Sequence, residues 1–345
     1  MSVFLGLLAA VVALYLIVYY NVVKGSRCKS TAVLTGKTAI VTGSANTGIG
    51  KSTALELARR GARVIVACRN KQRAEAAIYD IRRESGNNQV VYMQLDLASL
   101  KSVRSFAETF LRQEPRLDLL INNAGVIGPG RTEDGFGMAF GVNHLGHFLL
   151  TYLLLERLKQ TGGARVITVS ARLYRLGSVD FSTLAAHKDL VTGQSTVDNI
   201  RAYSNSKLCN VLFTRELANR LEGTGVTCYS LHPGASVLSS LSCVDRAVAD
   251  RVVLFLPPTG VIHTNICRNM SLWLRLAVAP IVWLFFLDVD AGAQTTLHCA
   301  LQEGIEPLSG RYFSDCAVCE LNAKARDDAV AKKLWEVSER LCGLS

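Results

Sequence analysis

Charged residues and proline are scarce in this 345-residue sequence: Asp, Glu, Lys and Arg make up 19% of it, and it has seven prolines. Disordered chains need a higher charge, and collagen-like chains need far more proline. Internal repeats and low-complexity linkers are also lacking. Because 49% of the residues are hydrophobic, the chain can bury a large core. The composition therefore excludes disordered, fibrous and small disulfide-stapled proteins and indicates about one large domain.

A paired cysteine motif is also missing. Cys316 and Cys319 form a CxxC motif, but no second CxxC or CxH completes a zinc set. His144 and His147 have no carboxylate or third histidine nearby in sequence, so they read as packing or pocket residues. We predict no metal site. In a reducing cytosol the scattered cysteines act as small core residues rather than bridges; they are residues 28, 68, 209, 228, 243, 267, 299, 316, 319 and 342.

The net charge of +10 does not indicate a nucleic-acid partner. Basic residues stand beside acidic ones, as in Glu56, Arg59 and Arg60, which is typical of a solvated helix face. There is no tract that mixes arginine with aromatic residues. A basic surface facing anionic lipid fits better.

One long hydrophobic run, Val3 to Val23, has 21 residues without a charge, enough to cross about 30 Å of hydrocarbon. A signal peptide would have a basic start and an Ala-x-Ala-like cleavage site, and both are missing. Basic residues follow the run, beginning with Lys24, Arg27 and Lys29. We therefore expect an anchor over residues 1–24, a basic linker over 25–36, and a body on the cytosolic side of the endoplasmic reticulum or another endomembrane.

From residue 36 onward, short β-branched runs alternate with helical spacing of apolar residues. The runs predict strands at 38–42, 63–67, 90–94, 117–121, 165–170 and 226–231, and the spacing predicts helices at 49–60, 71–84, 99–113 and 201–222. This order indicates an α/β fold with a doubly wound parallel sheet covered on both faces. We expect a single domain over 37–322, followed by a C-terminal helix in 323–345. The apolar stripe of this helix, formed by Val330, Leu334, Val337 and Leu341, indicates packing rather than partner binding.

The first predicted strand runs into a glycine-rich turn, Thr42 to Gly50, and then a helix. Its glycines allow a pyrophosphate close to the backbone, at the positive end of the helix. The second strand ends in Arg69 rather than in an acid that would bind ribose hydroxyls. Arg69, with Lys51, offers cations to a 2′-phosphate, which favours NADP(H) over NAD(H). The alternative is that Arg69 only opens the next helix.

Tyr203 and Lys207 lie four residues apart on a predicted helix, so their side chains share one face. In that arrangement the ammonium can lower the pKa of the phenol and let it exchange protons. A Tyr and a Lys at this spacing are common by chance. The pair indicates catalysis only together with the motifs around it.

Together, these motifs resemble the short-chain dehydrogenase/reductase family, from about Gly36 to the C-terminus. The resemblance rests on the glycine turn, the strings at 122–125 (NNAG), 143–148 (NHLGHF) and 232–234 (HPG), Ser170, and the Tyr203/Lys207 pair. The 143–148 string, the Ala67 to Arg69 strand end and the N-terminal anchor resemble the retinol dehydrogenase branch. The resemblance implies a Rossmann fold and a nicotinamide cofactor.

The physical reading of the catalytic residues agrees with the family pattern. Tyr203 is expected to be the general acid/base, and Lys207 to hold its pKa down and bind the nicotinamide ribose. Ser170 is expected to hydrogen-bond the substrate oxygen, and Asn143 to position a water. The cofactor-binding residues that we expect are Gly43, Ser44, Asn46, Thr47, Gly48, Ile49, Gly50, Arg69, Asp96, Asn123, Ala124, Gly125, Tyr203, Lys207, Pro233, Gly234 and Thr264.

One segment departs from the family pattern. Gly234 is followed by 26 residues, 235–260, before the string that ends in Thr264, and deleting them restores the family string. The segment is either an insertion that extends the substrate loop or a translated intron. The second interpretation is favoured because 26 codons keep the frame and residues 254–258 suit a pyrimidine-rich splice tract. Sequencing the transcript would separate the two.

Residues 272–287 are strongly apolar but are interrupted by Arg275 and Pro280. They read either as a substrate region that dips into a membrane surface or as a buried helix pair. The sequence thus predicts an NADP(H)-dependent oxidoreductase of a lipophilic alcohol or carbonyl, with retinol/retinal as the family-based candidate. Alternatives are a reductase of other lipid or steroid carbonyls and a catalytically weak, membrane-tethered scaffold. The expected partners are the substrate and membrane lipid, and homo-oligomerisation stays open.

Overall fold

The computed structural model describes residues 25–44, 48–233 and 289–344. Its sheet has eight strands in the order β3-β2-β1-β4-β5-β6-β7-β8, parallel except for the antiparallel pair β7 and β8. The strands are β1 Thr38–Thr42, β2 Arg63–Cys68, β3 Val90–Gln94, β4 Leu119–Asn122, β5 Arg165–Val169, β6 Thr227–Leu231, β7 Tyr312–Ser314 and β8 Ala317–Val318. The predicted doubly wound parallel sheet is confirmed.

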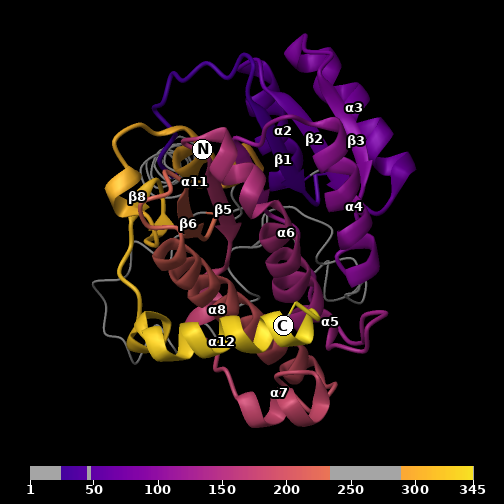
Figure 1. Ribbon diagram of the computed structural model, residues 1–345, viewed down its shortest axis with the longest axis vertical. Helices are drawn as coiled ribbons and strands as arrows, with labels where there is room; N and C mark the ends of the chain where they lie inside the picture. Colours follow the sequence, from indigo (N-terminus) through magenta and orange to yellow (C-terminus); the bar gives the residue numbers. More distant parts are fainter. Residues whose placement is uncertain (1–24, 45–47, 234–288, 345) are drawn as a thin grey trace, which may run out of the picture.

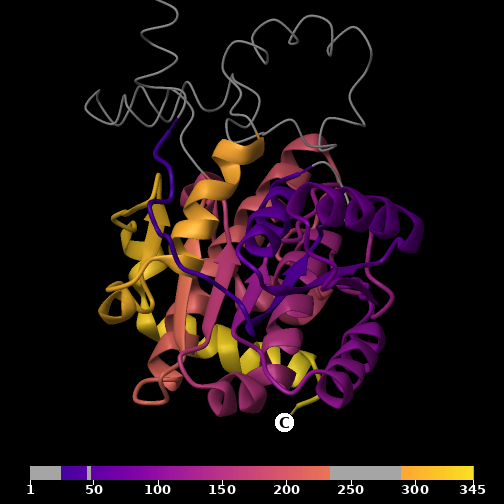
Figure 2. The same ribbon diagram turned by 90° about the horizontal axis from the view of Figure 1, so that it is seen from above.

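Helices cover both faces of this sheet (Figures 1 and 2). One layer has α2 Ile49–Arg59, α3 Lys71–Ser85 and α11 Val289–Leu301, and the other has α4 Leu100–Gln113, α6 Gly146–Thr161, α8 Thr196–Arg220 and α12 Asp328–Leu341. Successive residues of β1 point to opposite faces. Ile40 packs in the core under α4, α6 and α8, whereas Ala39 and Val41 pack under α2, α3 and α11. This two-sided burial explains why the strands are nearly continuous apolar runs.

Shorter elements connect these layers. Two helices, α5 Met138–Phe140 and α7 Phe181–His187, accompany a π-helical turn at Gly141–Leu145 and 3₁₀ turns at Arg172–Leu176, Glu306–Leu308 and Ala323–Arg326. The predicted strands match those observed to within two residues at each end.

The helical stretch Met138–Thr161 is long and apolar enough to cross a membrane, but 78% of its most apolar window is buried inside the fold. It is therefore a core helix. The sequence did not single it out, because a helix that is apolar on nearly every side shows no amphipathic period.

The C-terminal helix α12 lies across α8 in Figure 1. Trp335 of α12 meets Phe148 of α6 edge-on, with ring centroids 4.9 Å apart, and stacks on Phe213 of α8 at 5.9 Å. Leu334 is also buried. The helix thus completes the core on this face, which agrees with the packing role expected from its apolar stripe.

Residues 25–36, expected to be a basic linker, bind along the folded body. Cys28 N donates to Gln294 Oε1 of α11, and Ser30 Oγ donates to the carbonyl of Leu301 at the end of that helix. Arg27 and Lys29 are exposed. The expected anchor at 1–24, the segment 235–260 and the apolar segment 272–287 lie outside the described residues. All eight described cysteines are free, five of them buried.

Candidate active site

The carboxyl ends of four adjacent strands gather most of the predicted site residues. Strand pairing places Val41 beside Ile121, Asn122 beside Thr168, and Val169 beside Leu231. The residues that follow these strands therefore meet at one edge of the sheet. In parallel α/β sheets this edge is where ligands bind, near the point at which the strand order reverses. Here the order reverses between β1 and β4.

Two hydrogen bonds fasten Lys207 to the end of β5. The Lys207 ammonium donates to the carbonyl of Val169 at 3.0 Å, and the Ser170 hydroxyl donates to the backbone carbonyl of Lys207 at 2.7 Å. Both Ser170 and Lys207 are buried. The predicted serine and lysine are therefore held together by bonds between strand and helix that the sequence alone does not reveal.

Tyr203 lies one helical turn before Lys207, and the lysine Nζ is 5.5 Å from the centroid of its ring. Burial raises the pKa of Tyr203 to about 12 and lowers the pKa of Lys207 to about 8. The expected lowering of the tyrosine pKa is thus wrong for this structure. The physical reason is that removal from water disfavours the charged form of both groups.

Asn143 lies in the π-helical turn between α5 and α6, a kind of irregularity that is frequent at functional sites. Val126 N donates to its Oδ1 at 2.8 Å, and its Nδ2 donates to the Val126 carbonyl at 3.0 Å and to Ser206 Oγ at 2.9 Å. Both amide protons are thus used inside the protein. The side chain clamps the loop after β4 to α8, and only its oxygen keeps a lone pair for the expected water.

Close backbone packing shapes the cofactor side of the site. Gly43 has a φ of +70°, and a Cβ there would come within 2.9 Å of Ala124. A Cβ on Gly125 would lie 3.3 Å from Lys207 Nζ and 3.7 Å from Asn143 Oδ1. The NNAG segment after β4 therefore passes directly against the glycine turn and the lysine. A side chain at either glycine would disturb this cradle.

The loops after β1 and β4 are tied by Thr42. Its hydroxyl accepts hydrogen bonds from the backbone N–H groups of Asn123 and Ala124, each at 2.9 Å, and Asn123 Nδ2 donates to the Thr42 carbonyl. Helix α2 then begins after Gly48, and no side chain among the described residues caps it. Its first N–H groups are suited to an anion such as a pyrophosphate.

Arg69 and Lys51, the two cations that the sequence predicts for a 2′-phosphate, have different surroundings in the structure. Arg69 is exposed at the end of β2 and makes no ion pair or hydrogen bond with another described residue. Lys51 instead pairs with Asp80 of α3, with 2.6 Å between Nζ and Oδ2. A carboxylate from the neighbouring helix thus shares Lys51, and its expected part in binding a 2′-phosphate stays a prediction. The described residues fit a nicotinamide cofactor through Lys207, Gly43 and the first N–H groups of α2.

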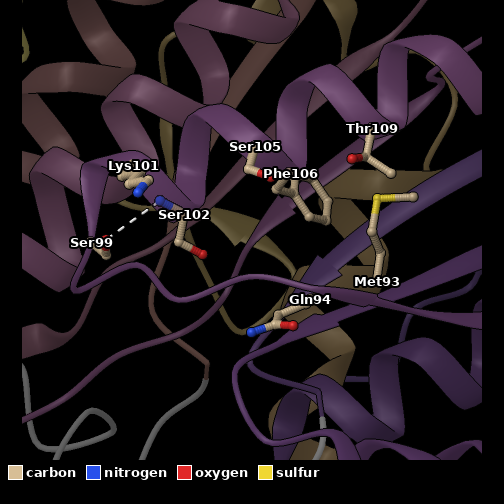
Figure 3. Close-up of a pocket in the computed structure, with 8 residues that line it drawn as sticks. All are labelled: Met93, Gln94, Ser99, Lys101, Ser102, Ser105, Phe106 and Thr109. Carbon is tan, nitrogen blue, oxygen red and sulfur yellow. Dashed lines mark hydrogen bonds between the residues drawn. The ribbon is translucent and has the colours of Figure 1, made fainter.

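Asp96 follows β3, where its carboxylate accepts a hydrogen bond from Ala98 N and its backbone N–H donates to Ser102 Oγ. A pocket of about 380 Å³ lies nearby between β3 and α4 (Figure 3), with hydroxyls of Ser99, Ser102 and Thr109 on one wall. None of the predicted catalytic residues lines it. The pocket is therefore separate from the predicted catalytic residues.

The remaining predicted cofactor residues lie near the ends of the described ranges or outside them. Ser44 is buried after β1, Ile49 opens α2, and Pro233 follows β6. Asn46, Thr47, Gly234 and Thr264 are outside the described residues.

The sequence did not single out Thr42 or Ser206 and assigned His147 to packing or to the pocket. A usable signal existed for two of them, because Thr42 is a hydroxyl at the very end of the first strand and Ser206 directly precedes the lysine. Among the described residues, no group of three His, Cys, Asp or Glu side chains could hold a metal ion.

Comparisons with known proteins agree with this geometry. The family model described as short chain dehydrogenase matches residues 37–195. Dehydrogenase/reductase SDR family member 13 from Bos taurus is 53% identical over 330 residues, covering 96% of this chain and 79% of the relative. Human retinol dehydrogenase 12 is 45% identical over 351 residues, covering all of this chain and 99% of the relative. Residues 19–24 and 301–312 already resemble member 13 in sequence.

The fold is shared with solved structures. The Pseudomonas aeruginosa RhlG/NADP active-site complex superposes with a TM-score of 0.57 at 21% identity, covering 82% of this chain and 95% of that one. The relatives with about half of their residues identical decide the assignment, since they extend over nearly the whole chain. The chain is a member of the short-chain dehydrogenase/reductase family and thus an oxidoreductase.

Proposed function

We propose that the protein is an NADP(H)-dependent oxidoreductase that interconverts a lipophilic alcohol and its carbonyl, with retinol and retinal as the leading pair. The observation that carries the proposal is a cluster at the carboxyl edge of the sheet: Ser170 is bonded to Lys207, Asn143 is bonded to the neighbouring Ser206, and Tyr203 lies one turn away. The relatives named retinol dehydrogenase support the substrate class.

Each residue of the cluster has a distinct task in this proposal. Tyr203 gives a proton to the carbonyl oxygen in reduction and removes it from the alcohol in oxidation. Lys207 and Ser170 bind the cofactor ribose and the substrate oxygen, respectively. Asn143 keeps the loop after β4 in register with α8. The bound cofactor supplies or accepts the hydride.

The pKa of Tyr203 predicts a different pH dependence for the two directions. A phenol with a pKa of about 12 is protonated at pH 7, so it is ready to act as the acid in reduction. Oxidation needs the phenolate, whose fraction rises about tenfold per pH unit below the pKa. Between pH 6 and 8 we expect a nearly constant reduction rate and an oxidation rate that rises about tenfold per unit. Steady-state kcat in both directions measures this, and an oxidation rate that is flat over this range would contradict it.

Arg69 is proposed to select NADP(H). Because a charge-assisted hydrogen bond contributes about 1.5 to 3 kcal/mol, Arg69→Ala should lower kcat/KM for NADPH about 10- to 100-fold and leave the value for NADH nearly unchanged. Arg73→Ala is the matched control, since Arg73 is another exposed arginine one turn into α3. Equal losses with NADPH and NADH, or equal effects of the two substitutions, would remove this role from Arg69.

We further propose that the apolar residues 3–23 anchor the protein to the endoplasmic reticulum or another endomembrane with its body in the cytosol, where a bilayer-dissolved substrate is close by. The exposed Arg27 and Lys29 suit an anionic lipid surface. Homo-oligomerisation stays a proposal that sizing in detergent can address.

Purified full-length protein with NADPH and all-trans-retinal tests the proposal. NADPH consumption that produces retinol in stoichiometric amounts supports it. Binding of NADPH without turnover of retinal or of other lipid and steroid carbonyls would instead support a catalytically weak, membrane-tethered scaffold. The sequence feature that favours this alternative is the 26-residue segment 235–260, which departs from the family pattern.

A further inference from the structure

His147 lies one residue into α6, is 1% exposed, and is bonded on both ring nitrogens. Its Nε2 is 2.9 Å from the Thr42 hydroxyl oxygen, and its Nδ1 is 3.1 Å from the backbone carbonyl oxygen of Asn143. The imidazole therefore bridges the end of β1, where the cofactor turn begins, and the π-helical turn that holds Asn143. None of the roles proposed above uses this residue.

The partners of the ring determine where its proton lies. The Asn143 carbonyl can only accept, so Nδ1 must carry the proton. Burial lowers the pKa of His147 to about 4, and the neutral ring then offers an unprotonated Nε2 as an acceptor. The single hydroxyl proton of Thr42 has two acceptors within reach, Nε2 at 2.9 Å and the Ile121 carbonyl at 3.4 Å, and the shorter contact favours donation to Nε2. The threonine oxygen keeps its lone pairs for the N–H groups of Asn123 and Ala124.

This order of donors and acceptors continues to the catalytic lysine. Asn143, held at its carbonyl by His147, donates from its side chain to Ser206, the residue before Lys207. Asn123, on the other side of Thr42, donates from its side chain to the Thr42 carbonyl beside Gly43. One buried chain of hydrogen bonds thus joins the glycine turn to the helix that carries Tyr203 and Lys207.

We propose that His147 is a positioning residue that couples the cofactor turn to the catalytic cluster: as the neutral Nδ1–H tautomer it orients the Thr42 hydroxyl toward itself and holds the carbonyl of Asn143. This inference rests on the proposed binding of NADP(H). It predicts that loss of the two ring bonds loosens the cofactor cradle more than it destabilises the fold.

A second histidine on the same helical stretch provides the control. His144 is equally buried and uses only Nε2, at 2.9 Å from the Ser338 hydroxyl of α12. Phe140, Phe148 and Phe213 surround it. Its replacement removes a buried hydrogen bond of the same kind at a place that does not touch the cofactor loops.

The test compares His147→Phe, His147→Gln and His144→Phe in the full-length protein. NADPH affinity is measured by fluorescence titration, and the melting temperature is measured without cofactor. We expect His147→Phe to weaken NADPH binding about tenfold and His144→Phe to change it less than twofold, although both lower the melting temperature. His147→Gln should recover affinity to within about threefold, because an amide also offers one donor and one acceptor.

Equal effects of His147→Phe and His144→Phe on NADPH affinity would overturn the inference and leave the proposed function intact. The same holds if His147→Gln binds NADPH no better than His147→Phe. If the wild-type protein binds no NADPH, the proposed function fails, and the inference fails with it. Nitrogen chemical shifts of His147 in the cofactor-free protein give a separate readout. The Nδ1–H tautomer is expected at pH 7, and an Nε2–H or doubly protonated ring would contradict the bonding order.

Discussion

Tyr203→Phe is expected to lower kcat for carbonyl reduction by about 10²- to 10⁴-fold, the usual contribution of a positioned general acid. The substitution removes only the phenol oxygen, for which the structure gives no hydrogen-bond partner among the described residues, so the fold should be retained. Lys207, Ser170 and Asn143 keep their bonds to β5, α8 and the loop after β4. NADPH affinity should therefore stay within about threefold of the wild-type value.

Tyr152→Phe is the matched control for this prediction. Tyr152 lies on α6, where its ring packs near Phe148 and Trp335 and away from the proposed chemistry. Its replacement should leave kcat within about twofold of wild type. A Tyr203→Phe enzyme that reduces substrate at the wild-type rate would remove Tyr203 from the mechanism. A parallel loss of NADPH binding would mean that the effect lies in cofactor binding or in the fold rather than in proton transfer.

Mild acid is expected to unfold the protein, because three histidines are buried in neutral form. Burial lowers the pKa of His144 and His232 to about 3 and that of His147 to about 4. In the unfolded chain each would have a pKa near 6.5. The unfolded state therefore binds more protons below pH 6.5, and stability falls as the pH is lowered through this range.

The expected slope is large. Each buried histidine contributes up to about 1.4 kcal/mol per pH unit, so the three together approach about 4 kcal/mol per unit between pH 6 and pH 4.5. Typical domains have only about 5 to 15 kcal/mol of stability. Urea unfolding followed by circular dichroism at several pH values should show the midpoint falling steeply in this window.

His144→Phe supplies a control for the acid prediction, since it should reduce the slope by about one third while lowering stability at pH 7. The pKa values of some carboxyl groups, such as Asp118 and Asp180, are lowered in the folded protein. Their contribution to stability is lost mainly below about pH 4, so it has little effect in this window. A urea midpoint that stays constant from pH 7 to pH 4.5 would show that the imidazoles accept protons without unfolding.

Much of the fold could be predicted because its strands are short, apolar and bounded by turns. The runs at 38–42 and 90–94 are strands with the predicted bounds. The hairpin of β7 and β8 was missed, since strands of three and two residues show no period. The C-terminal helix could be read from its apolar stripe. Its main anchor, Trp335, stands beside that stripe, and the aromatic cluster that receives it comes from two distant helices.

The predicted site residues gather where expected, because strand ends carry them to one edge of the sheet. Partners between elements could not be predicted. Lys51 forms its ion pair with Asp80 only because α2 packs on α3. The Lys207 ammonium donates a hydrogen bond to the carbonyl of Val169 in β5. The pKa of Tyr203 depends on burial, which spacing along a helix does not report. The same holds for the bonds of His147, whose partners Thr42 and Asn143 come from separate segments.

The most direct test of the proposed chemistry is transfer of deuterium from NADPH that carries deuterium at both hydrogen positions of the nicotinamide C4. Full-length protein would be incubated with labelled NADPH and all-trans-retinal, and the retinol would be analysed by mass spectrometry. The proposed function predicts one deuterium at the alcohol carbon with the wild-type protein and almost no labelled product with Tyr203→Phe. Retinol without deuterium, or equal labelling by both proteins, would contradict hydride transfer with Tyr203 as the proton donor.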